Sequence, residues 1–248
     1  MRTQERIGVG LLITLAVFSA IGVFLIDPIA QDPLYHNFSD AVEMFNVANF
    51  WNVVSNIPFA IVGILGLINV NKILGYKIQY CFLFIGIILV SIGSGYYHLS
   101  PTNSSLVWDR LPMTIVFMSL VSIILSEFIN PKLGNRLLMP LVFVGMLSVV
   151  YWVVFNDLRP YVLVQFYPMF ALPIILLSFK SSFTMNYGYW TLIVAYIIAK
   201  LSENYDEEIF ATLSFISGHS IKHIISAIGL AVLVFTYIER REIILNTV

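Results

Sequence analysis

The amino-acid sequence predicts an all-α integral membrane protein, with a core of seven transmembrane helices and one extra transmembrane helix before it. Of its 248 residues, 59% are hydrophobic and only 11% are charged, whereas a typical soluble domain carries about 25% charged residues. The apolar residues gather in long runs, and most runs approach the ~20 residues that a helix needs to cross a bilayer. Basic residues fall mainly on one side of the resulting topology, as is typical of multi-pass proteins.

The first apolar run, residues 8–26, predicts the extra helix. It follows Arg2 and Arg6 and resembles a signal anchor, because Asp27 and Pro28 come next without a clear small-residue cleavage site. Cleavage of this segment would leave seven helices.

The remaining apolar runs predict the core, and the last but one is the shortest. The largest connections are residues 28–48 and 203–216, and nothing beyond the apolar runs suggests a second domain. In chain order the core runs cover residues 49–70, 79–98, 111–129, 137–155, 160–179, 188–202 and 217–238.

The placement of lysine and arginine predicts how these helices are oriented. If both termini are cytoplasmic, nine of the 13 basic residues lie in cytoplasmic segments and most acidic residues lie in the outer connections. The basic residues at the outer ends of the helices are then Arg110, Arg159, Lys200 and Lys222.

Five polar residues fall at the outer ends of these predicted helices. Ser94 and His98 are four positions apart, as are His219 and His223, so each pair shares one helix face. Asp109 precedes the run at 111–129. Ionisable groups are costly at membrane depth and usually functional. Because the orientation was derived without these residues, their convergence on one leaflet predicts a polar site that faces the non-cytoplasmic side.

The residue types of this site predict metal-assisted hydrolysis. Three imidazoles and one water form a catalytic zinc site, which lowers the pKa of the water to about 7 and polarises a carbonyl oxygen. We expect His98, His219 and His223 to hold Zn²⁺. Asp109 would then serve as general base and later as acid, and Ser94 would donate a hydrogen bond to the developing oxyanion. The predicted activity is that of an amidase or esterase at the level of the lipid headgroups.

Simpler explanations exist for each residue. Histidines in membrane helices often bond neighbouring helices or bind haem, Asp109 would favour the positive end of a helix dipole, and Ser94 would bond its own backbone. His36, in the outer loop, is assigned a structural role. A transporter would need polar residues along a path, yet the cytoplasmic half holds almost none, and we interpret the exception, Glu127, as interfacial.

Composition also bears on binding partners. The net charge of −1 offers no basic surface for nucleic acid. The single cysteine, Cys81, allows no intrachain disulfide and no cysteine-rich zinc motif.

Three motifs resemble those of the alkaline ceramidases, a family within a superfamily of membrane hydrolases that includes adiponectin-receptor-like proteins. The segment 49–56 also resembles the first core helix of that family, and the resemblance extends over about residues 37 to 238. The motifs are Ser94-Gly95-Tyr96-Tyr97-His98, Trp108-Asp109-Arg110-Leu111-Pro112-Met113 and Gly218-His219-Ser220-Ile221-Lys222-His223.

The resemblance implies a seven-helix hydrolase core over residues 49–238, preceded by an anchor and outer loop, 1–48, and followed by a cytoplasmic tail, 239–248. It implies that zinc on the three histidines supports hydrolysis of the N-acyl bond of a ceramide-like membrane lipid, which yields a sphingoid base and a fatty acid. It leaves open a receptor or sensor that retains the zinc site, because the superfamily contains receptor-like members.

The chain departs from the family where some members bind calcium, since Asn49 replaces a glutamate. The outer loop offers other oxygen ligands of the kind that Ca²⁺ accepts, although their spacing differs from the family pattern. On the helix that follows, three polar residues share one face and would bond either the metal ligands or neighbouring helices. The calcium candidates are Asp32, Asn37, Asp40 and Glu43, and the three polar residues are Asn52, Ser55 and Asn56.

Overall fold

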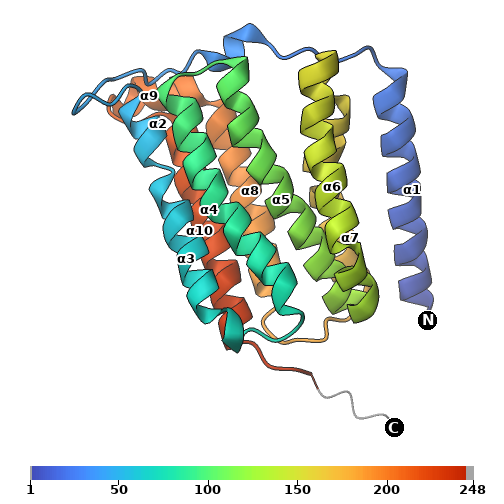
Figure 1. Ribbon diagram of the computed structural model, residues 1–248. Coiled ribbons are helices and arrows are strands. Elements are labelled where there is room, and N and C mark those ends of the chain that lie inside the picture. The colour runs from blue at the N-terminus through green and yellow to red at the C-terminus, as the bar shows by residue number, and fades with distance from the viewer. Residues whose placement is uncertain (1, 244–248) are drawn as a thin grey trace.

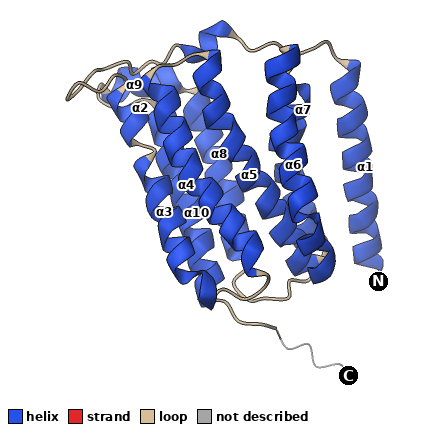
Figure 2. Ribbon diagram, viewed as in Figure 1, coloured by secondary structure: helices blue, strands red, loops and turns tan. Residues whose placement is uncertain are grey.

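Long helices run side by side through most of the chain (Figure 1), and the helical content dominates throughout (Figure 2). The structure is a computed structural model that describes residues 2–243. Within this range seven helices are long and apolar enough to cross a membrane, and only isolated β-bridges occur. The chain is therefore an all-α, multi-pass membrane protein, as the sequence predicted.

Each predicted apolar run forms a helix, the run at 49–70 is divided, and the connections contain two further short helices, Pro33–His36 and Asp206–Leu213. The helices that meet the length and hydropathy criteria are α1 (Thr3–Leu25), the segment formed by α2 (Phe50–Val54), α3 (Ile57–Asn69) and the 3-10 turn η2 (Val70–Lys72), then α4 (Lys77–Leu99), α5 (Asn103–Phe128), α6 (Pro131–Phe155), α7 (Arg159–Ser178) and α10 (Gly218–Glu239). The others are η1 (Pro33–His36), α8 (Tyr187–Asn204) and α9 (Asp206–Leu213).

The helix α8 corresponds to the shortest predicted run and falls below the hydropathy criterion, yet it packs closely along α10. A Cβ atom on Gly229 would lie 2.6 Å from the Cβ of Ala195, and one on Gly188 would lie 2.3 Å from Oγ1 of Thr236. Small residues permit such close approach of membrane helices. The bundle therefore contains α8 as a further member.

The helix α5 begins earlier than predicted. Thr102 and Ser105 form a reciprocal capping box at its start, which satisfies backbone N–H groups that would otherwise lack partners. The helix thus extends through Asp109, which the sequence placed before it.

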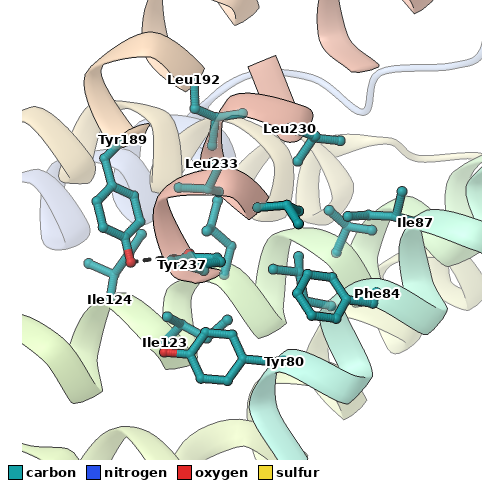
Figure 3. Close-up of a cluster of buried hydrophobic side chains, with 14 of the residues drawn as sticks. Tyr80, Phe84, Ile87, Ile123, Ile124, Tyr189, Leu192, Leu230, Leu233 and Tyr237 are labelled. Atoms are coloured by element: carbon teal, nitrogen blue, oxygen red, sulfur yellow. Dashed lines mark hydrogen bonds between the residues drawn. The ribbon is translucent and has the colours of Figure 1, made fainter. Parts of the chain in front are cut away.

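The core of the bundle lies where α4, α5, α8 and α10 meet. Apolar packing and interhelical hydrogen bonds hold membrane helices together, because lipid tails remove the hydrophobic driving force. The hydroxyl of Tyr237 donates to that of Tyr189 at 3.1 Å. Figure 3 shows this cluster with Tyr80, Phe84, Ile87, Ile123, Ile124, Tyr189, Leu192, Leu230, Leu233 and Tyr237 labelled.

The sequence suggested that Glu127 is interfacial. In the structure this residue is instead buried, at one end of the core. Its carboxylate pairs with Arg240 and accepts hydrogen bonds from the hydroxyls of Tyr80 at 2.8 Å and Tyr189 at 2.7 Å. The network joins α4, α5 and α8 to the residue that follows α10. A buried carboxylate needs such partners, and no local pattern reveals residues that lie so far apart in sequence.

The helix α1 lies at one edge of the bundle, beside α7 (Figure 1). Gly8 sits against Ser178, and Gln4 donates to the carbonyl of Leu177 at 2.7 Å. The start of α1 and the end of α10 lie at the same end of the bundle, while α9 and the start of α10 lie at the other (Figure 1).

Candidate functional site

Three histidines meet at the end of the bundle that carries α9. His98 comes from the last turn of α4, and His219 and His223 come from the first two turns of α10. The ring centroids lie 4.9 to 5.0 Å apart, and one nitrogen of each ring lies within 4.8 Å of the others. All three side chains are buried. This is the group in residues 2–243 that has the ligand set for a metal ion.

Local sequence positions the two histidines of α10. Ser217 caps the helix through the backbone N–H of Ser220, and Asp206 accepts a hydrogen bond from the N–H of His219 at 2.6 Å, where a carboxylate also favours the helix dipole. Gly218 lies so close to α8 that a Cβ atom would come within 2.0 Å of the carbonyl oxygen of Ser202. Glycine at this position lets α10 start against α8.

The histidines also contact polar groups behind them. The hydroxyl of Ser55 lies 2.8 Å from Nδ1 of His223, which leaves Nε2 of that ring free to bind a metal. Asn49 donates to the carbonyl of His98 at 2.8 Å. Nδ1 of His98 is buried without a hydrogen-bond partner in the described chain. Three clustered imidazoles form a donor set that fits a borderline-soft cation such as zinc, although Nζ of Lys222 lies 3.0 Å from Nε2 of His219.

The three polar residues before α3 divide between two roles. Ser55 contacts a histidine, whereas Asn52 accepts from the hydroxyl of Ser220 at 2.8 Å and donates to the carbonyl of Asp40 at 2.8 Å. Asn56 donates to the carbonyl of Asn52, and its own Oδ1 is a buried atom that lacks a partner in residues 2–243. Asn52 thus joins the outer loop and α10, and Ser55 orients a histidine.

Ser94 and Asp109 lie beside the histidines because α4 and α5 approach closely at Gly93. A Cβ atom on Gly93 would lie 1.9 Å from the carbonyl oxygen of Trp108. Ser94 is buried. Both residues line the same cavity as His223.

The cavity has a volume of about 340 Å³ and is lined by these polar residues and by side chains of α3, α4, α5, α7, α8 and α10. Apart from this polar end its walls are largely apolar. The apolar lining includes Met113, Phe117, Met169, Leu192 and Leu230. The cavity therefore combines a site for polar chemistry with space for an apolar chain.

The calcium candidates do not come together in the same way. Asp32 caps η1 through the backbone N–H of Leu34, and Glu43 is exposed. Asp40 is buried, burial raises the pKa of its carboxyl, and its Oδ2 has no partner within residues 2–243. Asp32, Asp40 and Glu43 form no common metal-binding group in the described range, and Asn37 serves as the cap residue that ends η1. The calcium site stays a prediction.

His36 has the structural role that the sequence suggested. Nδ1 lies 2.9 Å from the hydroxyl of Tyr97, and Nε2 lies 2.9 Å from Oδ1 of Asn103. Both contacts tie the outer loop to the helices. It is not a member of the three-histidine group.

Arg110, Lys200, Glu203 and Lys222 also line the cavity, and motif reasoning did not single them out. Nζ of Lys222 lies 3.0 Å from Nε2 of His219 and donates to Glu203 at 2.8 Å. A signal was present in the sequence, because Arg110, Lys200 and Lys222 are among the few basic residues that the topology left on the outer side.

A family model described as Ceramidase matches residues 39–209 of this chain. The match covers well over half of the chain and includes Ser94, His98 and Asp109, whereas His219 and His223 lie beyond its end. A comparison with curated proteins found no match.

Proposed function

The chain belongs to the ceramidase family, and from this membership we propose a zinc-dependent intramembrane amidase that hydrolyses the N-acyl bond of ceramide-like lipids. The products are a sphingoid base and a fatty acid. One observation carries the proposal: the buried group of His98, His219 and His223 adjoins Ser94 and Asp109 at the polar end of a largely apolar cavity.

The three histidines would hold zinc, and the donor set fits that ion. A zinc ion on three imidazoles supplies Lewis acidity, which lowers the pKa of water and polarises a carbonyl. Ser55 contributes by bonding Nδ1 of His223, since a partner on one ring nitrogen orients the other toward the metal.

In this proposal Asp109 transfers protons, and Ser94 stabilises the negative charge that develops on the carbonyl oxygen. Asp109 takes a proton from the attacking water as its oxygen bonds to the amide carbon, and it delivers a proton to the nitrogen as the C–N bond breaks. Ser94 donates a hydrogen bond to the carbonyl oxygen as negative charge develops there. Both side chains line the cavity.

The apolar part of the cavity would take the acyl or sphingoid chain. Its walls come from α3, α4, α5, α7, α8 and α10, so the substrate chain would lie among helices on all sides. Burial of apolar surface at about 25 cal/mol per Å² would favour such binding.

We infer that the site faces the non-cytoplasmic side and that both termini are cytoplasmic. The connections at the opposite end of the bundle carry most of the basic residues, including Lys72, Lys77, Lys132 and Arg136. Basic connections remain in the cytoplasm during insertion.

The proposal is tested by zinc analysis and N-acyl lipid hydrolysis with detergent-purified protein. Wild-type protein should contain about one zinc per chain and release fatty acid from ceramide. His219→Ala should lose both zinc and activity. Asp109→Asn should keep its zinc but lose about 10²- to 10⁴-fold in kcat, the range for a general acid–base residue.

His36→Ala is the matched control, because it removes a histidine that lies outside the three-histidine group, and it should retain its zinc. Zinc without hydrolysis of any N-acyl lipid would contradict the amidase and favour the receptor or sensor. Wild-type protein purified without chelators and free of metal would refute the zinc site.

A further inference from the structure

Basic side chains from three different helices line the outer end of the cavity. Arg110 comes from α5, Lys200 from α8 and Lys222 from α10, and the acidic residues that line the same cavity are Asp109 and Glu203. Three positive and two negative side chains leave one excess positive charge, before any metal is bound. A cavity with this charge favours an anionic ligand.

Arg110 is the most unusual of these cations. It is 7% exposed, and its guanidinium lies 4.5 Å from the ring centroid of Trp152 and 5.1 Å from that of Tyr161. Nη2 donates to Gln31 at 2.7 Å. The aromatic rings and the glutamine hold the guanidinium in one position without neutralising it.

Nη1 of Arg110 is buried and has no hydrogen-bond partner in residues 2–243, and Arg110 takes part in none of the ion pairs found there. A buried cation without an anion is costly, and a cation–π contact offsets only part of that cost. Guanidinium N–H groups bind phosphate and carboxylate in a fixed geometry. The free Nη1 therefore offers a donor to an oxyanion inside the cavity.

Lys222 and Lys200 share a single carboxylate. Glu203 accepts from Lys222 at 2.8 Å through Oε1 and from Lys200 at 2.6 Å through Oε2. An ammonium has three N–H donors, and only one of them is needed for the bond from Lys222 to Glu203. The remaining N–H groups of Lys222 are available near His219. One carboxylate cannot neutralise both lysines, so a positive charge remains beside the histidines.

The two cations lie next to the residues of the proposed chemistry. Arg110 lines the same cavity as Asp109, and Nζ of Lys222 lies 3.0 Å from Nε2 of His219. In an N-acyl sphingoid lipid, the headgroup oxygen is only a few bonds from the amide nitrogen. A headgroup must therefore lie close to whatever residues act on the amide.

We propose that Arg110 and Lys222 form a headgroup subsite, and that the preferred substrate is an N-acyl lipid whose headgroup carries an oxyanion such as a phosphate ester. This inference rests on the proposed amidase function. It assigns Arg110 and Lys222 the selection of the headgroup, separate from the roles of Asp109 and Ser94.

The test compares two substrates with the same acyl chain, ceramide and ceramide 1-phosphate, in the same mixed micelles with zinc-loaded, full-length protein. The quantity measured is the ratio of kcat/KM for the phosphorylated to the neutral lipid. Wild-type protein should favour the phosphorylated lipid by about tenfold or more, the size expected of hydrogen bonds to charged groups. Arg110→Gln and Lys222→Gln should each lower this ratio by about tenfold.

Arg159→Gln is the matched control, because Arg159 is another outer basic residue that pairs with Asp157 and does not line the cavity. It should leave the ratio unchanged. A wild-type ratio of one or less, or a ratio that neither Arg110→Gln nor Lys222→Gln alters, would overturn the subsite. Lys222 lies on a different helix, so if Arg110→Gln does not fold, the ratio measured for Lys222→Gln still tests the subsite.

Binding of the two lipids to metal-free protein separates this inference from the amidase proposal. Tighter binding of ceramide 1-phosphate that depends on Arg110, without hydrolysis by zinc-loaded protein, would retain the subsite and reject the amidase. Hydrolysis of ceramide with no preference for the phosphorylated lipid would retain the amidase and reject the subsite.

Discussion

At the scale of single residues, two glycines decide where the reacting groups stand. Gly93 lets α4 cross α5 beside Trp108, and Gly218 lets α10 begin against Ser202. Because a side chain at either position would overlap backbone atoms, the separation of the helices depends on the absence of a Cβ atom. Ser94 and His219 follow these glycines in the chain, so the close approach of the helices fixes where their side chains lie.

We therefore predict that Gly93→Ala moves α4 away from α5 and impairs the site. The new Cβ would lie 1.9 Å from the carbonyl oxygen of Trp108, and overpacking of this kind costs about 1–3 kcal/mol. The melting temperature should fall, and hydrolysis should fall with it because Ser94 and Asp109 separate.

Gly95→Ala is the control for this prediction, measured by the same thermal melts. A Cβ on Gly95 meets no atom within 4 Å, and alanine is favoured over glycine in a helix by about 1 kcal/mol. Gly95→Ala should be as stable as the wild type or more so. Equal melting temperatures for Gly93→Ala and the wild type would show that α4 and α5 tolerate a wider spacing.

At the scale of elements, helix ends make the contacts that matter most. The ends of α4, α5 and α10 near α9 carry the proposed chemistry, and the opposite ends of α4, α5, α8 and α10 are joined by the Glu127 network. This network holds the bundle at the end remote from the site. Packing between the two ends is apolar (Figure 3).

Breaking the Glu127–Arg240 pair should strongly destabilise the bundle. Glu127→Gln leaves the buried guanidinium of Arg240 without its anion, and removal of one partner of a buried pair costs about 3–5 kcal/mol. The double variant Glu127→Gln, Arg240→Gln should be less destabilised than the sum of the single variants. Denaturant or thermal unfolding in detergent measures all three.

Glu5→Gln is the matched control for this prediction, because it removes a carboxylate from the largely exposed pair with Arg2. Exposed ion pairs contribute at most about 1 kcal/mol, so its stability should match that of the wild type. Additive losses from Glu127→Gln and Arg240→Gln would mean that the two side chains act independently.

At the scale of the whole molecule, α1 and the rest of the bundle differ in how much they contact. α1 packs along α7, through Gly8, Gln4 and Leu12. The loop that follows α1 is more involved, since Gln31 bonds Arg110 and Phe38 packs 4.7 Å from the rings of both His98 and His219. In the proposed division into an anchor, 1–48, and a hydrolase core, 49–238, the anchor segment therefore includes residues that contact the site.

Removal of residues 1–25 behind a new initiating methionine tests this division. Because α1 supplies no residue to the cavity or the three-histidine group, the shortened chain should retain its zinc and its hydrolytic activity in nanodiscs. Removal of residues 1–48 should abolish both, since it deletes Gln31 and Phe38. Loss of zinc on removal of residues 1–25 alone would place α1 within the functional core.

The sequence by itself determined the membrane architecture and the end of the bundle where the polar residues gather. Hydropathy, charge placement and i, i+4 spacing are local properties, and they predicted a helix at each of the eight apolar runs, including α8. They also predicted that Ser94, His98, Asp109, His219 and His223 gather at one end of the bundle. The motifs also indicated the family that the family model then matched.

Only the tertiary structure decided which of these residues touch and what surrounds them. The spacing of the three histidines, the burial of Glu127 against Arg240 and the aromatic surroundings of Arg110 all join segments that are distant in sequence. Such contacts depend on how closely and at what angle the helices cross. That geometry arises from many side chains packing at once, and no pattern within a single helix encodes it.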